Sequence, residues 1–152
     1  EVFSDRYKIV LDKSGSLQKT LAKKDYPVDV EAELKSQTGF ALYNVLHAID
    51  MLHRGEYWSS IKQTEVLRRR IVSLMDLSLR KEVAEEYRRL ESLFPSEVEK
   101  ELRKTLCAYK KSDIKKSIVV GTQLFCRVGQ ELADELAVKF PSEKFAHLLK
   151  HL

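Results

Sequence analysis

Residues that interrupt helices are scarce in this sequence. Its 152 residues include only five glycines and three prolines. An all-β domain of this length needs frequent turns, which these residue types usually supply. No apolar run approaches the ~20 residues of a membrane-spanning helix, and the charged start from Glu1 to Lys8 lacks the apolar stretch of a signal peptide. The sequence therefore predicts a soluble protein dominated by long helices.

Cysteine is also rare, and the two that are present, Cys107 and Cys126, do not form a C-x-x-C pair. Both lie in apolar patterns of helical spacing, which is typical of buried, reduced thiols. Disulfide frameworks belong to small secreted domains with many more cysteines. We therefore expect a cytoplasmic protein whose thiols are structural.

The charges nearly balance, with 27 Lys and Arg against 23 Asp and Glu, for a formal net charge of +4. This small positive excess favours an anionic partner such as a nucleotide. One interpretation of the basic residues is a strip that binds nucleic acid. The strip would consist of Arg68, Arg69, Arg70, Arg80, Lys81, Arg88 and Arg89. Because glutamates interrupt the strip and no aromatic residues are interleaved, we expect a solvated outer face and no nucleic-acid partner.

The first part of the chain is predicted to differ from the rest. Tyr7 to Asp12 is typical of a short strand, and Leu17 to Lys24 of a short helix. A lone strand must pair with a missing segment, a second copy of the chain, or an arm folded onto the same molecule. Since the chain starts at Glu1 without an initiator methionine, we interpret residues 1–24 as an arm left from a preceding domain and residues 25–152 as a helical domain.

A helical period begins near Val28 and continues to Arg54. Asp29 is placed to cap the first turn, and Gly55 suits a left-handed C-terminal cap. Gly39 interrupts the stripe and predicts a kink or a break there. The expected buried stripe consists of Val30, Leu34, Ala41, Val45, Ala48, Ile49 and Leu52.

Four further helices are predicted at residues 57–77, 80–92, 96–109 and 112–136, followed by a short one from Pro141. Ser96 with Glu99 forms a capping-box pattern, and Ser112 is a second candidate cap. The expected buried faces include Leu106 and Tyr109, while Gly121 and Gly129 indicate close helix contacts. Short connections between amphipathic helices predict an all-α, antiparallel bundle of about five to six helices with a short N-terminal strand.

No complete catalytic motif is present. His147 and His151 share a helical face but lack the Glu of an H-E-x-x-H site, and His47 and His53 do not face each other. We therefore expect no metal site. No nucleophile elbow or phosphate-binding loop occurs. Gly15-Ser16 with Asp29-Val30-Glu31 imitates a nucleotidyltransferase signature, but the acids stand at a helix start, where they stabilise the helix dipole.

The most specific stretch is Leu52-His53-Arg54-Gly55-Glu56-Tyr57-Trp58-Ser59-Ser60-Ile61, followed by Leu67-Arg68-Arg69-Arg70. It resembles the C-terminal helical domain of polymerase-β-like nucleotidyltransferases of the aminoglycoside and lincosamide type. The predicted strand with Gly15 is similar to the segment that leaves the catalytic sheet in that family. The apolar helix from Phe125 to Leu136 is similar to the family's last long helix.

The resemblance implies a preceding catalytic domain that holds Mg²⁺ and a nucleoside triphosphate, so no cofactor is expected in this chain itself. It also implies that the helical domain contacts a small-molecule acceptor and builds a homodimer. The implied substrate-contacting residues are Arg54, Glu56, Tyr57 and Trp58. The alternative is structural, with Glu56 stabilising a helix start and Trp58 covering the edge of the core.

Asp50 is the nearest match to the carboxylate that acts as general base in some family members, and a carboxylate near a hydroxyl is suited to that role. Asp50 is equally placed to pair with Arg54 on an exposed face. A second function remains open for the whole chain: a non-enzymatic helical interaction module that partners a separately encoded transferase.

Overall fold

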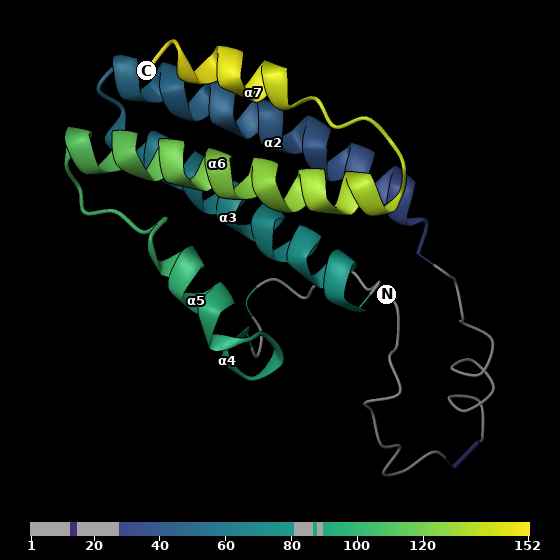
Figure 1. Ribbon diagram of the computed structural model, residues 1–152. Helices are drawn as coiled ribbons and strands as arrows, with labels where there is room; N and C mark the ends of the chain where they lie inside the picture. Colours follow the sequence, from purple (N-terminus) through teal and green to yellow (C-terminus); the bar gives the residue numbers. More distant parts are fainter. Residues whose placement is uncertain (1–12, 15–27, 81–86, 88–89) are drawn as a thin grey trace.

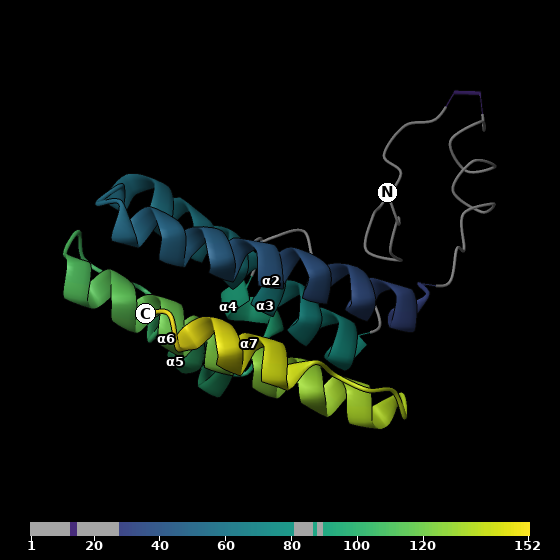
Figure 2. The same ribbon diagram turned by 90° about the horizontal axis from the view of Figure 1, so that it is seen from above.

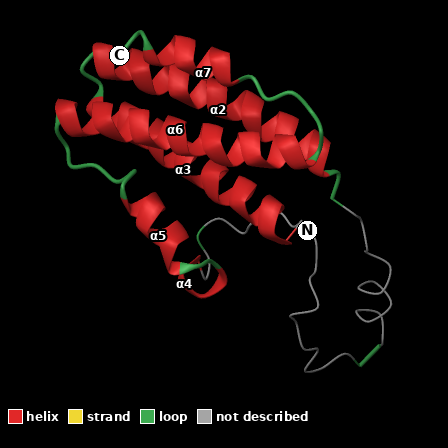
Figure 3. Ribbon diagram, viewed as in Figure 1, coloured by secondary structure: helices red, strands yellow, loops and turns green. Residues whose placement is uncertain are grey.

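Three long helices lying side by side form the body of the protein (Figure 1). The computed structural model describes residues 13–14, 28–80, 87 and 90–152. Within these ranges the secondary structure is helical, with no strand (Figure 3). The long helices are α2 (Val30–His53), α3 (Tyr57–Arg80) and α6 (Lys111–Glu135), and the shorter ones are α4 (Leu90–Leu93), α5 (Ser96–Arg103) and α7 (Ser142–Leu149). The predicted all-α helical bundle is confirmed.

The helices form two antiparallel pairs joined by a long connection. A tight turn at Arg54–Glu56 joins α2 to α3, and α7 runs back along α6 and α2 (Figures 1 and 2). Residues 90–110, which include α4 and α5, lead to the end of the bundle where α3 begins. As a result, α6 runs in the same direction as α3 (Figure 1).

Both ends of α2 follow the predicted capping. The side chain of Asp29 accepts a hydrogen bond from the backbone N–H of Ala32 at 3.0 Å. Gly55, just beyond the helix, has a φ of 77°, a conformation that glycine adopts without steric cost. No break occurs at Gly39, because α2 continues through this residue as one helix.

The capping predicted for two later helices is wrong. Pro95 holds the cap position of α5 without a side-chain cap bond, and the Ser96 hydroxyl instead donates to the carboxylate of Glu97 at 3.1 Å. Likewise α6 starts at Lys111, so Ser112 lies inside its first turn and bonds to Asp113 at 3.2 Å. In both cases the serine lies inside the helix, as its first residue in α5 and its second in α6, and its hydroxyl bonds to a neighbouring carboxylate.

The core lies where α2, α3 and α6 meet. Most of the predicted stripe of α2 is buried, with Val30 only partly so. The largest side chains with almost no exposed surface are Leu52, Leu67, Ile71, Leu74, Leu77, Ile114, Ile118, Phe125, Leu132 and Phe145. Burying each such side chain contributes roughly 1.5–3 kcal/mol, so the three-helix contact is the main source of stability.

Three aromatic rings hold α7 against α6. Phe145 of α7 lies 5.5 Å from Phe125 of α6 and 5.9 Å from Phe140, measured between ring centroids. Phe140 crosses α6 directly over Gly129, where an added Cβ would lie 2.4 Å from the ring. At Gly121 the added Cβ would lie 3.4 Å from Leu67 of α3. The predicted close approaches at both glycines are confirmed, although the partner of Gly129 is a ring beyond the helix.

Several sequence predictions fall outside the described residues. The strand at Tyr7–Asp12, the short helix at Leu17–Lys24 and the arm at residues 1–24 lie largely or wholly there. Most of the helix predicted at residues 80–92 does as well.

Replacing two helical glycines by alanine should have opposite effects. Gly129→Ala should lower the free energy of unfolding by about 1–3 kcal/mol, because Phe140 must move away from the new methyl group. Gly39→Ala should raise it by roughly 0.5–1 kcal/mol, because an added Cβ meets nothing within 4 Å. Urea unfolding followed by circular dichroism measures both changes. Equal destabilisation by the two variants would contradict this packing.

Candidate functional site

The residues implied by the resemblance gather at the turn between α2 and α3. Asp50 and Arg54 lie in and just after the last turn of α2, and Arg54 Nη2 approaches Asp50 Oδ2 at 2.9 Å, with both side chains substantially exposed. The exposed ion pair weighed as the alternative for Asp50 is therefore present. Glu56 is exposed and directly precedes α3, whose first two residues are Tyr57 and Trp58.

Trp58 does not cover the edge of the core. Its exposed fraction is 74%, so that structural alternative is wrong. The indole ring instead packs against Tyr109 at a centroid distance of 4.8 Å. Tyr57 meets the same Tyr109 ring edge-on at 5.7 Å. We call Tyr57, Trp58 and Tyr109 the aromatic platform.

Tyr109 of the aromatic platform belongs to a segment whose burial was predicted incorrectly from the sequence. Leu106 and Tyr109 were expected on a buried helix face, but they are 62% and 56% exposed. The reason is that α5 ends at Arg103, so the helical period does not extend to these residues. Lys110 and Lys111 follow Tyr109 directly in the sequence.

The geometry of the platform suits binding by stacking. Exposed aromatic faces attract flat rings and the C–H faces of sugars, and buried aromatic area dominates the energy of many binding sites. Arg54 and Glu56 add one charge of each sign to its α2 side.

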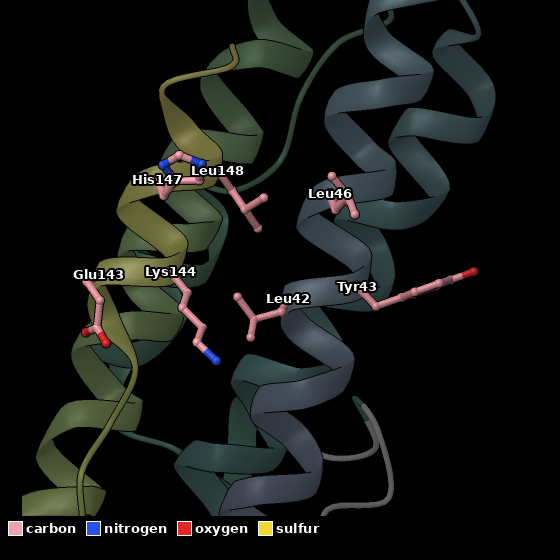
Figure 4. A pocket seen from close by; sticks show the side chains of 7 residues that line it. All are labelled: Leu42, Tyr43, Leu46, Glu143, Lys144, His147 and Leu148. Carbon is pink, nitrogen blue, oxygen red and sulfur yellow. The ribbon is translucent and has the colours of Figure 1, made fainter.

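A second concave surface lies between α2 and α7. This open groove has a volume of about 490 Å³ and is lined by Leu42, Tyr43, Leu46, Glu143, Lys144, His147 and Leu148. Figure 4 shows Leu42 and Leu148 between the two helices, whereas Tyr43 points away from α7. Sequence reasoning missed this groove, although Phe40, Tyr43 and Leu46 form an apolar series at three-residue spacing outside the buried stripe. That series was the available signal.

The described residues contain no arrangement of three or more His, Cys, Asp or Glu side chains suited to a metal ion. His147 and His151 share a face, as their spacing predicts, with ring centroids 5.2 Å apart. Asp76 has no exposed surface, so its carboxylate cannot meet a substrate at the surface.

Arg68 was expected to point outward, and this prediction is wrong. Its residue exposure is only 9%. Arg68 Nε donates to the hydroxyl of Thr105 at 2.7 Å, and Nη2 donates to the Thr105 carbonyl at 2.8 Å. The guanidinium also pairs with Glu65 in the same helix. Burial, and then the Glu65 carboxylate, raises the pKa of the Tyr87 hydroxyl above its usual value.

Both cysteines are free and half-buried, in place of the fully buried thiols expected. Burial raises the pKa of the Cys126 thiol to about 11. Because a thiolate is the reactive form, Cys126 is a poor nucleophile. It packs against the core from α6.

Comparisons with known proteins do not assign the chain to a family: no family model matches it, and no curated protein is significantly similar to it. Among the described helices, none combines the length and apolar character required to cross a membrane.

Arg68→Met should lower the free energy of unfolding by roughly 1–3 kcal/mol, because it removes the two hydrogen bonds that the nearly buried guanidinium donates to Thr105. The matched control is Arg103→Met, whose ion pair with Glu99 has an arginine that is 72% exposed and should contribute little. Urea unfolding of both variants measures the difference. A stability loss in Arg103→Met as large as that in Arg68→Met would contradict the role given to Arg68.

In a Cys107→Ala background, iodoacetamide should alkylate Cys126 roughly a hundredfold more slowly in the folded protein at pH 8 than in urea. The folded thiol has a pKa of about 11, whereas an unfolded thiol has a pKa of about 8.5. The folded state thus keeps a proton that the unfolded chain releases, so this group's contribution to stability should fall as the pH rises above about 8.5. Mass spectrometry of timed samples gives the rates, and equal rates would contradict the assigned burial.

Proposed function

We propose that this chain is a helical binding domain that works with a nucleotidyltransferase catalytic domain and contacts the acceptor substrate through the aromatic platform. The observation that carries the proposal is the exposure of Trp58, which is 74%, at the stretch that resembles such domains. An apolar ring of this size gains free energy when a ligand covers it. Mg²⁺ and the nucleoside triphosphate belong to the catalytic domain.

The surroundings of the platform support contact with a polar ring system. Tyr109 holds one face of the Trp58 indole at 4.8 Å, which orients the ring before a ligand arrives. Arg54 and Glu56 lie in the turn that leads into Tyr57 and Trp58 and supply hydrogen-bonding groups. Stacking combined with a few charged side chains is the usual composition of a sugar or drug site.

Asp50 takes the role of general base within this proposal only when its contact with Arg54 opens. The carboxylate oxygen that would accept a hydroxyl proton lies 2.9 Å from Arg54 Nη2. Because both side chains are exposed, the pair is weak and opening it costs little. A bound acceptor that takes Arg54 as its own partner would release Asp50.

The non-enzymatic interaction module remains the second candidate, and a different surface favours it. Phe40, Tyr43 and Leu46 on the outer side of α2 are each more than half exposed. Exposed apolar rows on a helix mark protein contacts more often than small-molecule sites. Acceptor binding therefore requires the exposed ring of Trp58, whereas the interaction module requires the exposed apolar side of α2.

Trp58 is the only tryptophan, so its fluorescence reports directly on the platform. Titration with an aminoglycoside and with a lincosamide should give a saturable change in emission for one of them. Tyr109→Ala should weaken that binding about tenfold, since stacking contributes ~1–3 kcal/mol per ring. Tyr43→Ala, on the outer side of α2, is the matched control and should leave the affinity unchanged.

The same titration with ATP and Mg²⁺ should give no saturable change. Emission that stays constant with both acceptor classes into the millimolar range would count against acceptor binding. Micromolar binding of the nucleotide would instead contradict the assignment of the catalytic centre to another domain.

A further inference from the structure

The outer side of α2 is uncharged over about four helical turns, although a surface helix normally carries charged and polar residues there. From Ser36 to Ile49 the helix contains no Asp, Glu, Lys or Arg. Phe40, Tyr43 and Leu46 within this stretch are each more than half exposed. The opposite face of α2 packs against α3 and α6, so these three side chains form an apolar row on the outside of the bundle.

The apolar row continues into the groove between α2 and α7. Tyr43 and Leu46 line this groove from α2, and Leu148 lines it from α7 (Figure 4). Gly39, one turn before Tyr43, is exposed, and an added Cβ there would meet nothing within 4 Å. The row and the groove therefore form one apolar surface. We call it the docking face, and it consists of Gly39, Phe40, Leu42, Tyr43, Leu46 and Leu148.

On the α7 side, a lysine without an acidic partner borders the docking face. The Lys144 side chain extends toward α2 at the groove, whereas Glu143 lies on the side of α7 away from α2 (Figure 4). None of the ion pairs between described residues includes Lys144. Its positive charge is therefore open to a carboxylate from outside this domain.

On the α3 side, Arg70 borders the docking face in the same way. Its guanidinium lies 4.8 Å from the centroid of the Phe40 ring, and its Nη1 donates to the side-chain oxygen of Gln37 at 3.2 Å. The nearby Glu33 accepts from the amide of Gln37 at 2.5 Å, and no ion pair between described residues includes Arg70. The docking face thus has an unpaired cation on each long side.

The charges at the two ends of the docking face are already balanced within α2. Before it, Lys35 pairs with Glu31 at 2.6 Å. After it, Arg54 pairs with Asp50 at 2.9 Å. The charges that face the surface and lack a counterion are therefore the two on its long sides, and both are positive.

We propose that the docking face binds an amphipathic helix of a partner protein, with apolar residues along its centre and Asp and Glu along both edges. Apolar residues three and four positions apart fill a groove of this kind. Carboxylates on the two edges then meet Lys144 and Arg70, which gives the contact its charge complementarity. The proposal is independent of acceptor contact at Trp58, and it gives a chemistry to the partner of the interaction module.

The shape of the docking face favours a helix over a small ligand or a membrane. Ligand sites enclose most of their ligand, whereas a small molecule in this open groove keeps much of its surface in water. A membrane surface is broad and does not enter a groove between two helices. A helix about 10 Å across covers the apolar row and the groove together, and Gly39 allows its backbone to approach α2 closely.

Charge opposes a second copy of this chain as the occupant. An isologous interface brings the same surface of both subunits together. Each subunit then adds its own Arg70 and Lys144, and no carboxylate of the docking face opposes them. Like charges brought together cost free energy, so the homodimer implied by the resemblance finds no support at this face.

Fluorescence anisotropy with two labelled peptides tests the proposal. Both peptides have the same helical pattern of leucines three and four residues apart, and one has glutamate at the flanking positions where the other has lysine. The glutamate peptide should bind the wild-type protein saturably and at least about tenfold more tightly than the lysine peptide. Raising NaCl from ~50 to ~500 mM should reduce this preference, because salt screens exposed charges. Equal binding of the two peptides at low salt would overturn the charge assignment.

Leu46→Ser should weaken binding of the glutamate peptide at least about tenfold, equivalent to ~1.4 kcal/mol, because the central apolar contacts of an interface carry most of its energy. The matched control is Leu106→Ser, since Leu106 is a comparably exposed leucine outside the docking face. It should bind as the wild type does. Both variants should keep the helical circular dichroism, and an equal loss of binding in the two would refute the location of the site.

Lys144→Glu should weaken binding of the glutamate peptide about tenfold at ~50 mM NaCl, because it places like charges side by side. Lys116→Glu makes the same change in net charge at an exposed position of α6 and should have a much smaller effect. The same anisotropy titration measures both. Equal effects would show that only the net charge of the domain attracts the peptide.

Wild-type protein that binds neither peptide up to ~1 mM, equivalent to −4.1 kcal/mol, would overturn the proposal. A concentration-dependent dimer that Leu46→Ser dissociates would then assign the face to a second copy. Sedimentation with vesicles of anionic phospholipid, lost in the same variant, would assign it to a membrane.

Tyr109→Ala separates this proposal from acceptor binding. The variant should lose acceptor binding and still bind the glutamate peptide, because Tyr109 lies outside the docking face. A chain that binds this peptide as described but binds neither acceptor class would disprove acceptor binding alone.

Discussion

The contact between Arg68 and Thr105 joins three parts of the chain. Arg68 of α3 binds both the hydroxyl and the carbonyl of Thr105, and the Ser117 hydroxyl of α6 donates to that same carbonyl at 2.5 Å. Thr105 follows the end of α5. Its hydrogen bonds therefore hold the segment between α5 and α6 against both α3 and α6. The parallel course of α3 and α6 depends on this segment. So does the aromatic platform, because Tyr109 lies a few residues beyond Thr105.

The two candidate surfaces occupy different parts of the bundle and make different physical demands. The platform at the α2–α3 turn needs Tyr109 to be held beside Trp58, so it depends on the connecting segment. The outer face of α2 needs only a straight helix, which the continuous path through Gly39 provides.

The long helices could be predicted from the sequence because their signals are local. The buried stripes of α2, α3 and α6 follow from helical periodicity, and Asp29 and Gly55 mark both ends of α2. The failures share a cause, which is tertiary structure. Arg68 was expected to face solvent because nothing near it in sequence explains its burial, and its partner Thr105 is 37 residues away.

The same cause explains the candidate site. Arg54, Glu56, Tyr57 and Trp58 were found through a local motif, and they do lie together because they are consecutive around one turn. Tyr109 was not found, since its approach to Trp58 requires α5 to stop at Arg103 and the chain to double back. The groove at α7 was missed for a related reason. The apolar series that includes Tyr43 and Leu46 is visible in the sequence, but the groove forms only when α7 docks beside α2.

The contact of Phe140 with Gly129 has a consequence for how α7 is ordered. A helix of eight residues is too short to be stable alone in water. The contacts of its Phe145 with the rings of Phe125 and Phe140 therefore stabilise α7. Phe140 occupies the volume that a side chain at position 129 would otherwise fill. Only glycine at this position leaves room for the ring. The position of α7, which forms one side of the groove, thus depends on Gly129 and Phe140, and neither residue lines the groove. Variation at position 129 would change what the groove accepts while leaving every lining residue the same.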